Sequence, residues 1–152
     1  MCAVSEGTAT SPATRNLGYD VIVTGRDGGP EVFSDYGAHP FASGRAPKVI
    51  NSAGLASTAS GRYQILLRFW RIYASRFRYL SFSPGYQDMY FDQQCRERGC
   101  LPDVDAGRFG IAVRKLDGLW ASFPGRSYDG QAQHTMDHLA AIYADAGGTI
   151  VT

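Results

Sequence analysis

The chain has 152 residues, 44% of them hydrophobic and 19% charged, a composition typical of a globular protein that is long enough to bury a core. Fifteen basic and 14 acidic residues leave a net charge of +1, and without a basic run this balance excludes nucleic-acid binding as the main function. No apolar stretch approaches the roughly 20 residues that cross a bilayer, so we expect one globular domain over residues 1–152.

The first element is expected to be the end of a helix. Cys2-Ala3-Val4 leads into Ser5-Glu6-Gly7-Thr8, and a glycine just past a helical segment commonly supplies the left-handed residue that ends the helix. Glu6 would then lie on the last helical turn at the edge of a cleft. Partial burial there can raise the pKa of a carboxyl and keep it protonated as a general acid. The alternative is a solvated glutamate, which is the usual state of a carboxylate.

A β-hairpin is expected next. Residues 19–25 and 31–36 are rich in β-branched and aromatic side chains, and they flank the turn cluster Arg26-Asp27-Gly28-Gly29-Pro30. Residues 37–60 follow as a long stretch with prolines at positions 40 and 47. We expect this stretch to be a surface loop with room for one more short strand.

Four helices are expected in the remainder of the chain, because apolar side chains recur at helical spacing between capping and stop residues. The helices begin at Ser60-Gly61, at the capping pair Ser83-Pro84, after Asp103-Val104-Asp105 and near Gln131. They end at Phe77, at Gly99, before Pro124-Gly125 and at Gly147-Gly148. A hairpin beside a helical bundle leaves a groove, and Glu6 is expected on the wall of that groove.

The spacing of the cysteines and histidines does not indicate a metal site. Cys2, Cys95 and Cys100 are an odd number of cysteines without metal-ligand spacing, so we expect free, mostly buried thiols in a protein made in the reducing cytoplasm. Residues 1–25 show no charged segment followed by a hydrophobic run, so we expect no signal peptide. His134 and His138 lie four residues apart on a predicted helix, but no third ligand is evident, and we expect surface histidines.

Ordered blocks spread over nearly the whole chain carry a family resemblance. Ser5-Glu6-Gly7-Thr8, followed by Thr14-Arg15-Asn16-x-Gly18-Tyr19-Asp20-Val21-Ile22-Val23, closely resembles the start of the phage lambda endolysin family, lysozyme-fold lytic transglycosylases. Further matching blocks are Phe33-x-Asp35-Tyr36-x-x-His39-Pro40, Gly61-Arg62-Tyr63-Gln64, Phe82-Ser83-Pro84-x-x-Gln87-Asp88, Gln93-Gln94-x-x-Glu97-Arg98-Gly99, Trp120-Ala121-Ser122-x-Pro124-Gly125 and Ala146-Gly147-Gly148-Thr149. The resemblance implies an α+β, lysozyme-like fold with a small β-hairpin lobe, a helical lobe and the active-site cleft between them.

The resemblance also implies an activity. Members of the family cleave the β-1,4 bond between N-acetylmuramic acid and N-acetylglucosamine in peptidoglycan, and they leave a 1,6-anhydromuramoyl end without using water. The catalytic glutamate of the family corresponds to Glu6, and no cofactor is implied. The expected partner is the peptidoglycan glycan strand, without nucleic acid and without stable membrane insertion. We expect a monomer that stays in the host cytoplasm until a holin opens the membrane, and that then acts on the wall in the periplasm.

Two departures from the family pattern are visible. Family members carry roughly a dozen more residues before the glutamate, whereas Glu6 is preceded here by Met1 and four further residues. The first helix is therefore expected to be truncated to about one turn, which has no cooperative stability of its own. The hairpin tip from Gly25 to Glu31 is also several residues longer, a change that hairpin tips usually tolerate.

A single carboxylate is enough for the implied chemistry. Glu6 would protonate the glycosidic oxygen and then accept the proton of the sugar's C6 hydroxyl, which attacks C1 within the same molecule. A hydrolytic muramidase ordinarily needs a second carboxylate, and Asp20 or Asp35 on the hairpin could supply it. The favoured alternative is that Asp20 caps a turn and Asp35 is solvated. An inactive peptidoglycan-binding relic is the remaining alternative, because the first helix is short.

Residues that could bind the sugar are expected around Glu6. Tyr63 and Gln64 would open the predicted helix beneath the groove, where Gln64 could bond an acetamido group or position Glu6 and Tyr63 could stack on a sugar face. The alternatives are a core tyrosine and a capping glutamine. The complete set of substrate-binding candidates is Tyr19, Asp20, Tyr36, Tyr63, Gln64 and Tyr128.

Overall fold

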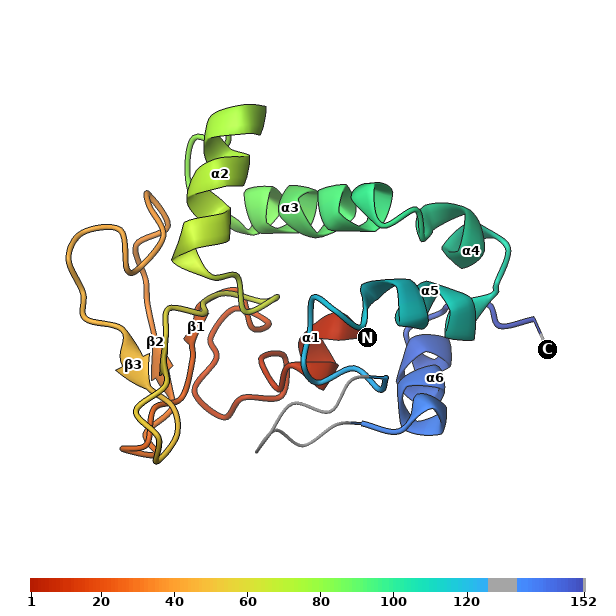
Figure 1. Cartoon of the computed structure of the whole chain (residues 1–152), viewed down its shortest axis with the longest axis horizontal. Helices are drawn as coiled ribbons and strands as arrows, with labels where there is room; N and C mark the ends of the chain where they lie inside the picture. The colour runs from red at the N-terminus through yellow and green to blue at the C-terminus, as the bar shows by residue number, and fades with distance from the viewer. Residues whose placement is uncertain (126–133, 152) are drawn as a thin grey trace. The chain divides into compact units, whose positions relative to one another are not determined.

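The computed structural model describes residues 1–125 and 134–151, which form α-helices and two antiparallel two-stranded sheets (Figure 1). The elements in chain order are α1 (Cys2–Ser5), β1 (Val21–Ile22), β2 (Glu31–Val32), β3 (Lys48–Val49), β4 (Ala56–Ser57), α2 (Leu67–Phe77), α3 (Pro84–Glu97), α4 (Leu101–Asp105), α5 (Phe109–Leu116) and α6 (Met136–Asp145). The chain divides into two compact units, one of residues 6–90 and one of residues 1–5 with 91–152. The extent of a single domain over residues 1–152 stays a prediction.

The first hairpin is confirmed, although its strands are only two residues long. Val21 pairs with Val32 and Ile22 pairs with Glu31 across β1 and β2. The turn between the strands is closed by Gly28, whose backbone N–H donates to Gly25 O at 2.9 Å and whose φ is +71°. Glycine adopts this left-handed conformation without steric cost, which is why the Asp-Gly-Gly cluster predicted the turn.

A second hairpin occupies the segment that was expected to be a loop with room for one strand. Lys48 of β3 pairs with Ser57 of β4, and Val49 pairs with Ala56. The side chain of Asn51 shapes the turn by accepting a hydrogen bond from Leu55 N at 2.9 Å. β4 consists of alanine and serine, which lack the β-branched signal of a strand, so the sequence did not predict it.

The first long helix begins later than predicted. α2 starts at Leu67, whereas residues 60–65 form a tight turn in which Ser60 and Ile65 exchange backbone hydrogen bonds of 3.1 and 2.8 Å. Ser60 also bridges to Ile22, so the turn extends the first sheet. The expectation that Tyr63 and Gln64 open this helix is therefore wrong, because their backbone is committed to the turn.

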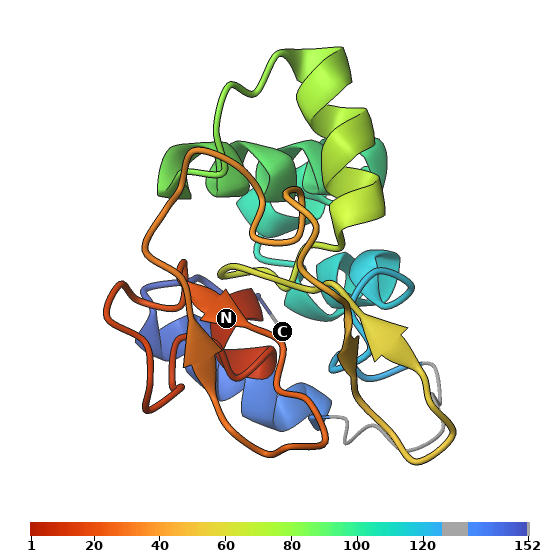
Figure 2. The same cartoon turned by 90° about the vertical axis from the view of Figure 1, so that its left-hand side faces the viewer.

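An aromatic core stabilises the unit of residues 6–90. It consists of Ile65, Trp70, Tyr79, Phe82 and Tyr90. Phe82 is fully buried, and its ring meets the Trp70 ring edge-on at 4.8 Å. α2 supplies Trp70 to this core and runs crosswise to α3, as Figures 1 and 2 show from two directions. Packing of this kind fixes the segments on both sides of the tight turn.

The helices of the other unit match the predictions in part. The end of α3 near Gly99 is confirmed, and that glycine has a φ of +63°. The predicted third helix, expected after Asp105 and up to Pro124, corresponds to α5 alone, which ends earlier, at Leu116. α4 is an additional helix that was not predicted, and it contains Asp103. The break between α4 and α5 falls at Gly107, whose φ is +69° and whose missing Cβ leaves room for Val151 at 2.8 Å. Trp120 lies beyond the end of α5 and is still buried.

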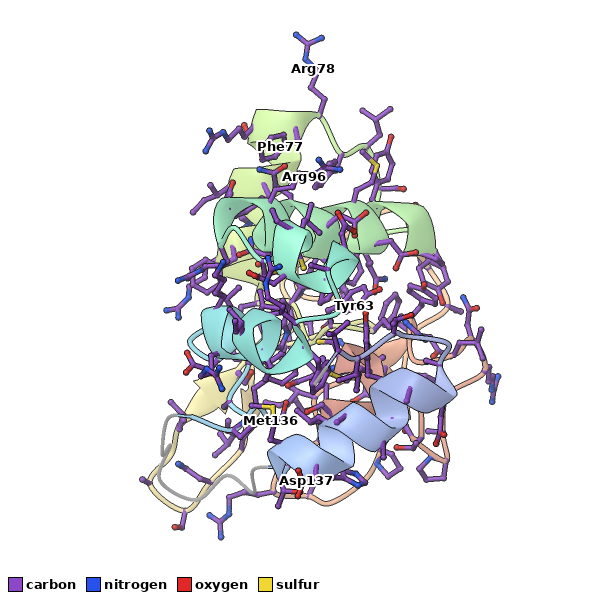
Figure 3. All side chains as sticks on the ribbon, turned by 90° about the vertical axis from the view of Figure 1, so that its right-hand side faces the viewer. Tyr63, Phe77, Arg78, Arg96, Met136 and Asp137 are labelled. Atoms are coloured by element: carbon purple, nitrogen blue, oxygen red, sulfur yellow. The ribbon has the colours of Figure 1, made fainter. Side chains whose placement is uncertain are left out.

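The last helix starts at Met136, not near Gln131, which lies outside the described residues. Its N-cap is Thr135, whose hydroxyl accepts a hydrogen bond from His138 N at 3.2 Å. Figure 3 shows Met136 and Asp137 in the first turn of this helix. His134 therefore precedes α6 and does not share a helical face with His138.

All three cysteines are free and buried, as predicted. Burial raises the pKa of the Cys95 and Cys100 thiols, which keeps both of them protonated and unreactive. Among the described residues, no helix is long and apolar enough to cross a membrane.

Candidate functional site

Glu6 directly follows α1, in the turn that ends this helix. Gly7 has a φ of +69°, so the predicted left-handed stop is confirmed. Glu6 is half-buried and lines a pocket of about 400 Å³ together with Gln64. The other lining residues are Gly7, Thr8, Thr10, Ser11, Pro12, Val21, Val23, Thr24 and Pro30.

The lining of this pocket suits a polar ring with apolar faces. Val21, Val23 and the two prolines offer apolar surface, and the Gln64 amide and the hydroxyl groups of Thr10, Ser11 and Thr24 offer hydrogen-bond partners. Ligand sites commonly combine a mostly apolar wall with a few polar groups that set orientation. Glu6 contributes a carboxyl group to a pocket of this composition.

Thr8 links the segment after Glu6 to the tight turn that carries Gln64. Its hydroxyl donates to Arg62 O at 2.7 Å, and Thr8 is only 1% exposed. Gly61 N donates to Val21 O at 2.7 Å, which joins the same turn to β1. Gln64 has a φ of +48°, a conformation that a non-glycine residue adopts only when its surroundings hold it there. These bonds bring Glu6 and Gln64 to one pocket.

Gln87 braces the turn from α3. Its Oε1 accepts from Arg62 N at 2.9 Å, and its Nε2 donates to Tyr19 O at 3.1 Å and to Phe82 O at 2.9 Å. Gln87 is fully buried, and a Cβ on Gly61 would lie 2.1 Å from its Oε1. Only glycine can therefore occupy position 61 beside this side chain.

The bracing role of Gln87 was not predicted from the sequence. One signal was available, since Gln87 shares a helical face with the buried Tyr90 and Gln94. A glutamine on the buried face of a helix needs partners within the protein, because an unpaired buried amide is costly.

Tyr19 and Tyr63 both donate their hydroxyls to one carboxylate. Tyr63 Oη lies 2.7 Å from Asp88 Oδ1, and Tyr19 Oη lies 2.9 and 3.0 Å from the two Asp88 oxygens. Burial and the Asp88 charge raise the pKa of both phenols, so both stay protonated donors. The Arg62 guanidinium lies 5.0 Å from the centre of the Tyr19 ring. Neither tyrosine lines the pocket of Glu6.

Asp20 and Asp35 lie outside the pocket of Glu6. Asp20 is 3% exposed, and its two oxygens accept from Thr14 Oγ1 at 2.5 Å and from Arg15 N at 2.8 Å. The carboxylate therefore caps the loop before β1. Asp35 is exposed and accepts from Gly37 N at 2.7 Å.

A second pocket, of about 480 Å³, is lined by Asp20 and Tyr36 together with Arg15, Asn16, Val32, Phe33 and Ser34. Asn16 Nδ2 donates to Tyr36 Oη at 2.9 Å and holds that ring in place. Tyr128, the remaining substrate-binding candidate, lies outside the described residues.

The two neighbouring histidines show no metal-binding arrangement. Their rings stack with centroids 5.0 Å apart, and His134 Nε2 lies 3.1 Å from Ser5 O. Within residues 1–125 and 134–151, no group of three or more His, Cys, Asp or Glu side chains could hold a metal ion. His138 is exposed, and His134 fixes the residue that precedes Glu6.

A buried histidine, His39, bonds to the turn that carries Gln64. The ring is 1% exposed, with Nε2 3.0 Å from Ile65 O and Nδ1 accepting from Phe41 N at 3.3 Å. This arrangement fits the neutral ring that donates from Nε2, and a proton on Nδ1 would face the Phe41 N–H. Burial, helped by the Arg71 charge, lowers the pKa of His39 from 6.5 to about 4.

The free energy of unfolding should therefore fall as the pH falls from about 6.5 toward 4. The unfolded chain binds this proton more readily than the folded chain, so the contribution is complete above the unfolded pKa. We expect a loss of about 2 kcal/mol between pH 7 and pH 5, measured by urea denaturation at both values. His138→Gln should keep this slope, and His39→Gln should flatten it. An equal slope in the His39 variant would assign the acid sensitivity to other groups.

Comparisons with known proteins identify the family of the chain. The family model described as Endolysin matches residues 1–150. The endolysin of Escherichia phage P2 is 52% identical over 148 residues, which cover 97% of this chain and 89% of the relative. The endolysin of Escherichia phage lambda is 44% identical over 151 residues, which cover 99% of this chain and 89% of the relative.

Solved structures match as well. Bacteriophage lambda lysozyme complexed with a chitohexasaccharide superposes with a TM-score of 0.87 at 43% identity, over 99% of this chain and 91% of that chain. A second structure of the lambda lysozyme gives a TM-score of 0.83 at 42% identity, with the same coverage. These matches confirm the predicted α+β, lysozyme-like fold.

Proposed function

Because the chain belongs to the endolysin family, and is thus a phage enzyme that degrades peptidoglycan in lysis of the cell wall, we propose that it is a lytic transglycosylase with Glu6 as its general acid and base. It cleaves the β-1,4 bond between N-acetylmuramic acid and N-acetylglucosamine and leaves 1,6-anhydromuramoyl ends.

The observation that carries this proposal is the composition of the Glu6 pocket. Among the described residues that line it, Glu6 is the one carboxylate. Both carboxylate oxygens of Asp20 already accept hydrogen bonds, from the Thr14 hydroxyl and from Arg15 N. Neither Asp20 nor Asp35 lines the pocket. A hydrolase that activates water ordinarily uses two carboxylates, whereas an intramolecular nucleophile needs only one group to move the proton.

In the proposed reaction Glu6 donates one proton and later regains one. Glu6 donates its proton to the glycosidic oxygen as the bond from C1 to that oxygen breaks, and N-acetylglucosamine leaves with a hydroxyl group. The 2-acetamido oxygen of the muramic acid stabilises the positive charge at C1. The C6 hydroxyl oxygen then bonds to C1 while the Glu6 carboxylate takes its proton, which restores the acid for the next cycle.

The remaining candidates are proposed to bind the glycan strand. Gln64 Nε2 donates to Gly61 O at 3.1 Å, so the amide also caps its own turn. Gln64 lines the pocket with Glu6 and is proposed to bond an acetamido group through its Oε1 and the second N–H of the amide. The pocket of Asp20 and Tyr36 is proposed to hold a neighbouring part of the strand. Tyr19 and Tyr63 are proposed to support the sugar site from the Asp88 side. The lambda lysozyme that was solved with a chitohexasaccharide supports saccharide binding here.

The biological setting belongs to the same proposal. The protein accumulates as a monomer in the host cytoplasm, and a holin opens the membrane so that it reaches the wall in the periplasm. It acts there as one domain over residues 1–152. Membership of the endolysin family supports the action on the cell wall.

The ends of the released muropeptides test the reaction type. Purified peptidoglycan is digested, treated with borohydride and examined by mass spectrometry. Anhydro ends resist reduction, so we expect the muramic acid ends to keep their mass. Ends that become alditols would instead identify a hydrolytic muramidase, and the name lysozyme of the lambda relative makes that the second candidate. Binding to walls without any release of muropeptides would identify a non-catalytic relic.

A further inference from the structure

One face of α2 exposes arginines and apolar side chains together, and so do Arg78 and Leu80 just after the end of the helix. The opposite face of the helix is committed to the aromatic core through Trp70, which is 6% exposed, and through Tyr73, Ala74 and Phe77. We call the exposed set the α2 outer face, and its members are Arg68, Phe69, Arg71, Ile72, Arg76, Arg78 and Leu80.

The apolar members of this face are large and open to solvent. Leu80 is 82% exposed, Ile72 is 59% exposed and Phe69 is 40% exposed. Single exposed apolar residues are common on proteins. Here Phe69 and Ile72 share the exposed side of one helix with arginines, and Leu80 follows just after the helix end, an arrangement typical of an interaction surface.

The α2 outer face carries positive charge that no acidic side chain in the same stretch of sequence balances. Four arginines belong to it, and no acidic residue occurs anywhere between Asp35 and Asp88. The ion pairs found among the described residues include none of these arginines. Arg78 extends away from the end of α2, where its backbone has a φ of +57° (Figure 3). The chain as a whole carries a net charge of only +1, so the positive charge is concentrated on this face.

We propose that the α2 outer face is a docking surface for a bilayer of anionic phospholipids. A helix with basic residues beside exposed apolar side chains adsorbs along the interface, where the apolar groups enter the headgroup boundary. Guanidinium groups bind phosphate through paired N–H donors, and they do so better than ammonium groups. α2 has 11 residues and one buried side, so it lies on the bilayer and does not span it.

Other occupants fit the face less well. A second copy of the chain would bring four arginines against four arginines, and like charges at close range repel. An acidic protein would match the arginines, but it would also need a groove for Phe69, Ile72 and Leu80. A bilayer satisfies both requirements without a shaped partner.

Vesicle binding tests the proposal. The full chain is sedimented with vesicles of phosphatidylglycerol and phosphatidylcholine, and with vesicles of phosphatidylcholine alone. We expect binding to the anionic vesicles at low salt and its loss at high salt, because the attraction is screened. Each arginine near an anionic surface strengthens binding about fivefold, so the triple variant R68Q/R71Q/R76Q should bind about a hundredfold more weakly. Ile72→Ser should also weaken binding.

A matched triple variant separates this face from net charge. R26Q/R98Q/R114Q removes three exposed arginines elsewhere and should weaken binding only a few-fold. Both triple variants should clear purified peptidoglycan, which contains no lipid, at the rate of the parent chain. Equal losses in the two triples, equal binding to neutral vesicles or no binding at all would overturn the proposal. The proposal would also be overturned if the chain sedimented as a dimer, if Ile72→Ser converted that dimer to a monomer, and if neither form bound lipid.

Discussion

Glu6→Gln is expected to slow the clearing of purified peptidoglycan by about three orders of magnitude, because removing a general acid and base typically costs between a hundredfold and ten-thousandfold. Glutamine has nearly the shape of glutamate, so the pocket with Gln64 should stay intact. The amide can neither protonate the glycosidic oxygen nor accept the proton of the C6 hydroxyl. Both half-reactions would fail together, and binding to the wall should remain.

Asp35→Asn is the matched control for this substitution. It also changes one carboxylate to an amide, but Asp35 is exposed and its Oδ1 only accepts from Gly37 N. For Asp35→Asn we expect at most a twofold change in the clearing rate. We expect the melting temperature to stay unchanged in both Asp35→Asn and Glu6→Gln. Asp20→Asn is a poorer control, since Asp20 is buried and accepts two hydrogen bonds. If Glu6→Gln keeps more than a tenth of the rate, the proposed role of Glu6 fails.

Gln87→Ala should destabilise the protein most among the substitutions considered, by about 3 kcal/mol. The variant leaves Arg62 N, Tyr19 O and Phe82 O without their partner in a fully buried place. It also opens a cavity where the amide lies against Gly61. Because this brace holds the turn that carries Gln64, we expect the clearing rate to fall as well. Urea denaturation and wall clearing measure the two effects.

Gln93→Ala provides the comparison on the same helix. Gln93 bonds only to Glu97 across an exposed stretch at 2.9 Å, so its removal should cost a few tenths of a kcal/mol. Gln87→Glu keeps the acceptor for Arg62 N and loses the donors to the two carbonyl oxygens, so it should fall between the two alanine variants. Similar stability of Gln87→Ala and Gln93→Ala would contradict the bracing role.

Local signals predicted the elements whose ends depend on single residues. Gly28 closes the first hairpin and Gly99 follows the end of α3, and both adopt the left-handed conformation that glycine favours. Ser83-Pro84 marked the start of α3, because the fixed φ of proline suits the first position of a helix. These preferences act within a few residues and are therefore readable in the sequence.

Contacts between distant residues explain what the sequence did not predict. Tyr63 continues the helical spacing of Leu66 and Trp70, so the sequence extends the helix into residues 60–65. Gln87, 25 positions away from Arg62, holds the backbone there in a turn. The hydroxyl of Tyr19 reaches Asp88 across 69 positions. No periodicity in the sequence indicates either bond. The resemblance brought Glu6 and Gln64 forward as candidates, whereas their common pocket became visible only in the structure.

The most direct test of the single-carboxylate account asks whether water enters the product. Peptidoglycan is digested in water enriched in the heavy isotope of oxygen, and the muramic acid ends are analysed by mass spectrometry. The account predicts that no heavy oxygen appears at C1, because the C6 hydroxyl of the same sugar supplies the new bond. One heavy oxygen atom at C1 for each bond cleaved would contradict it and would require a second group that activates water.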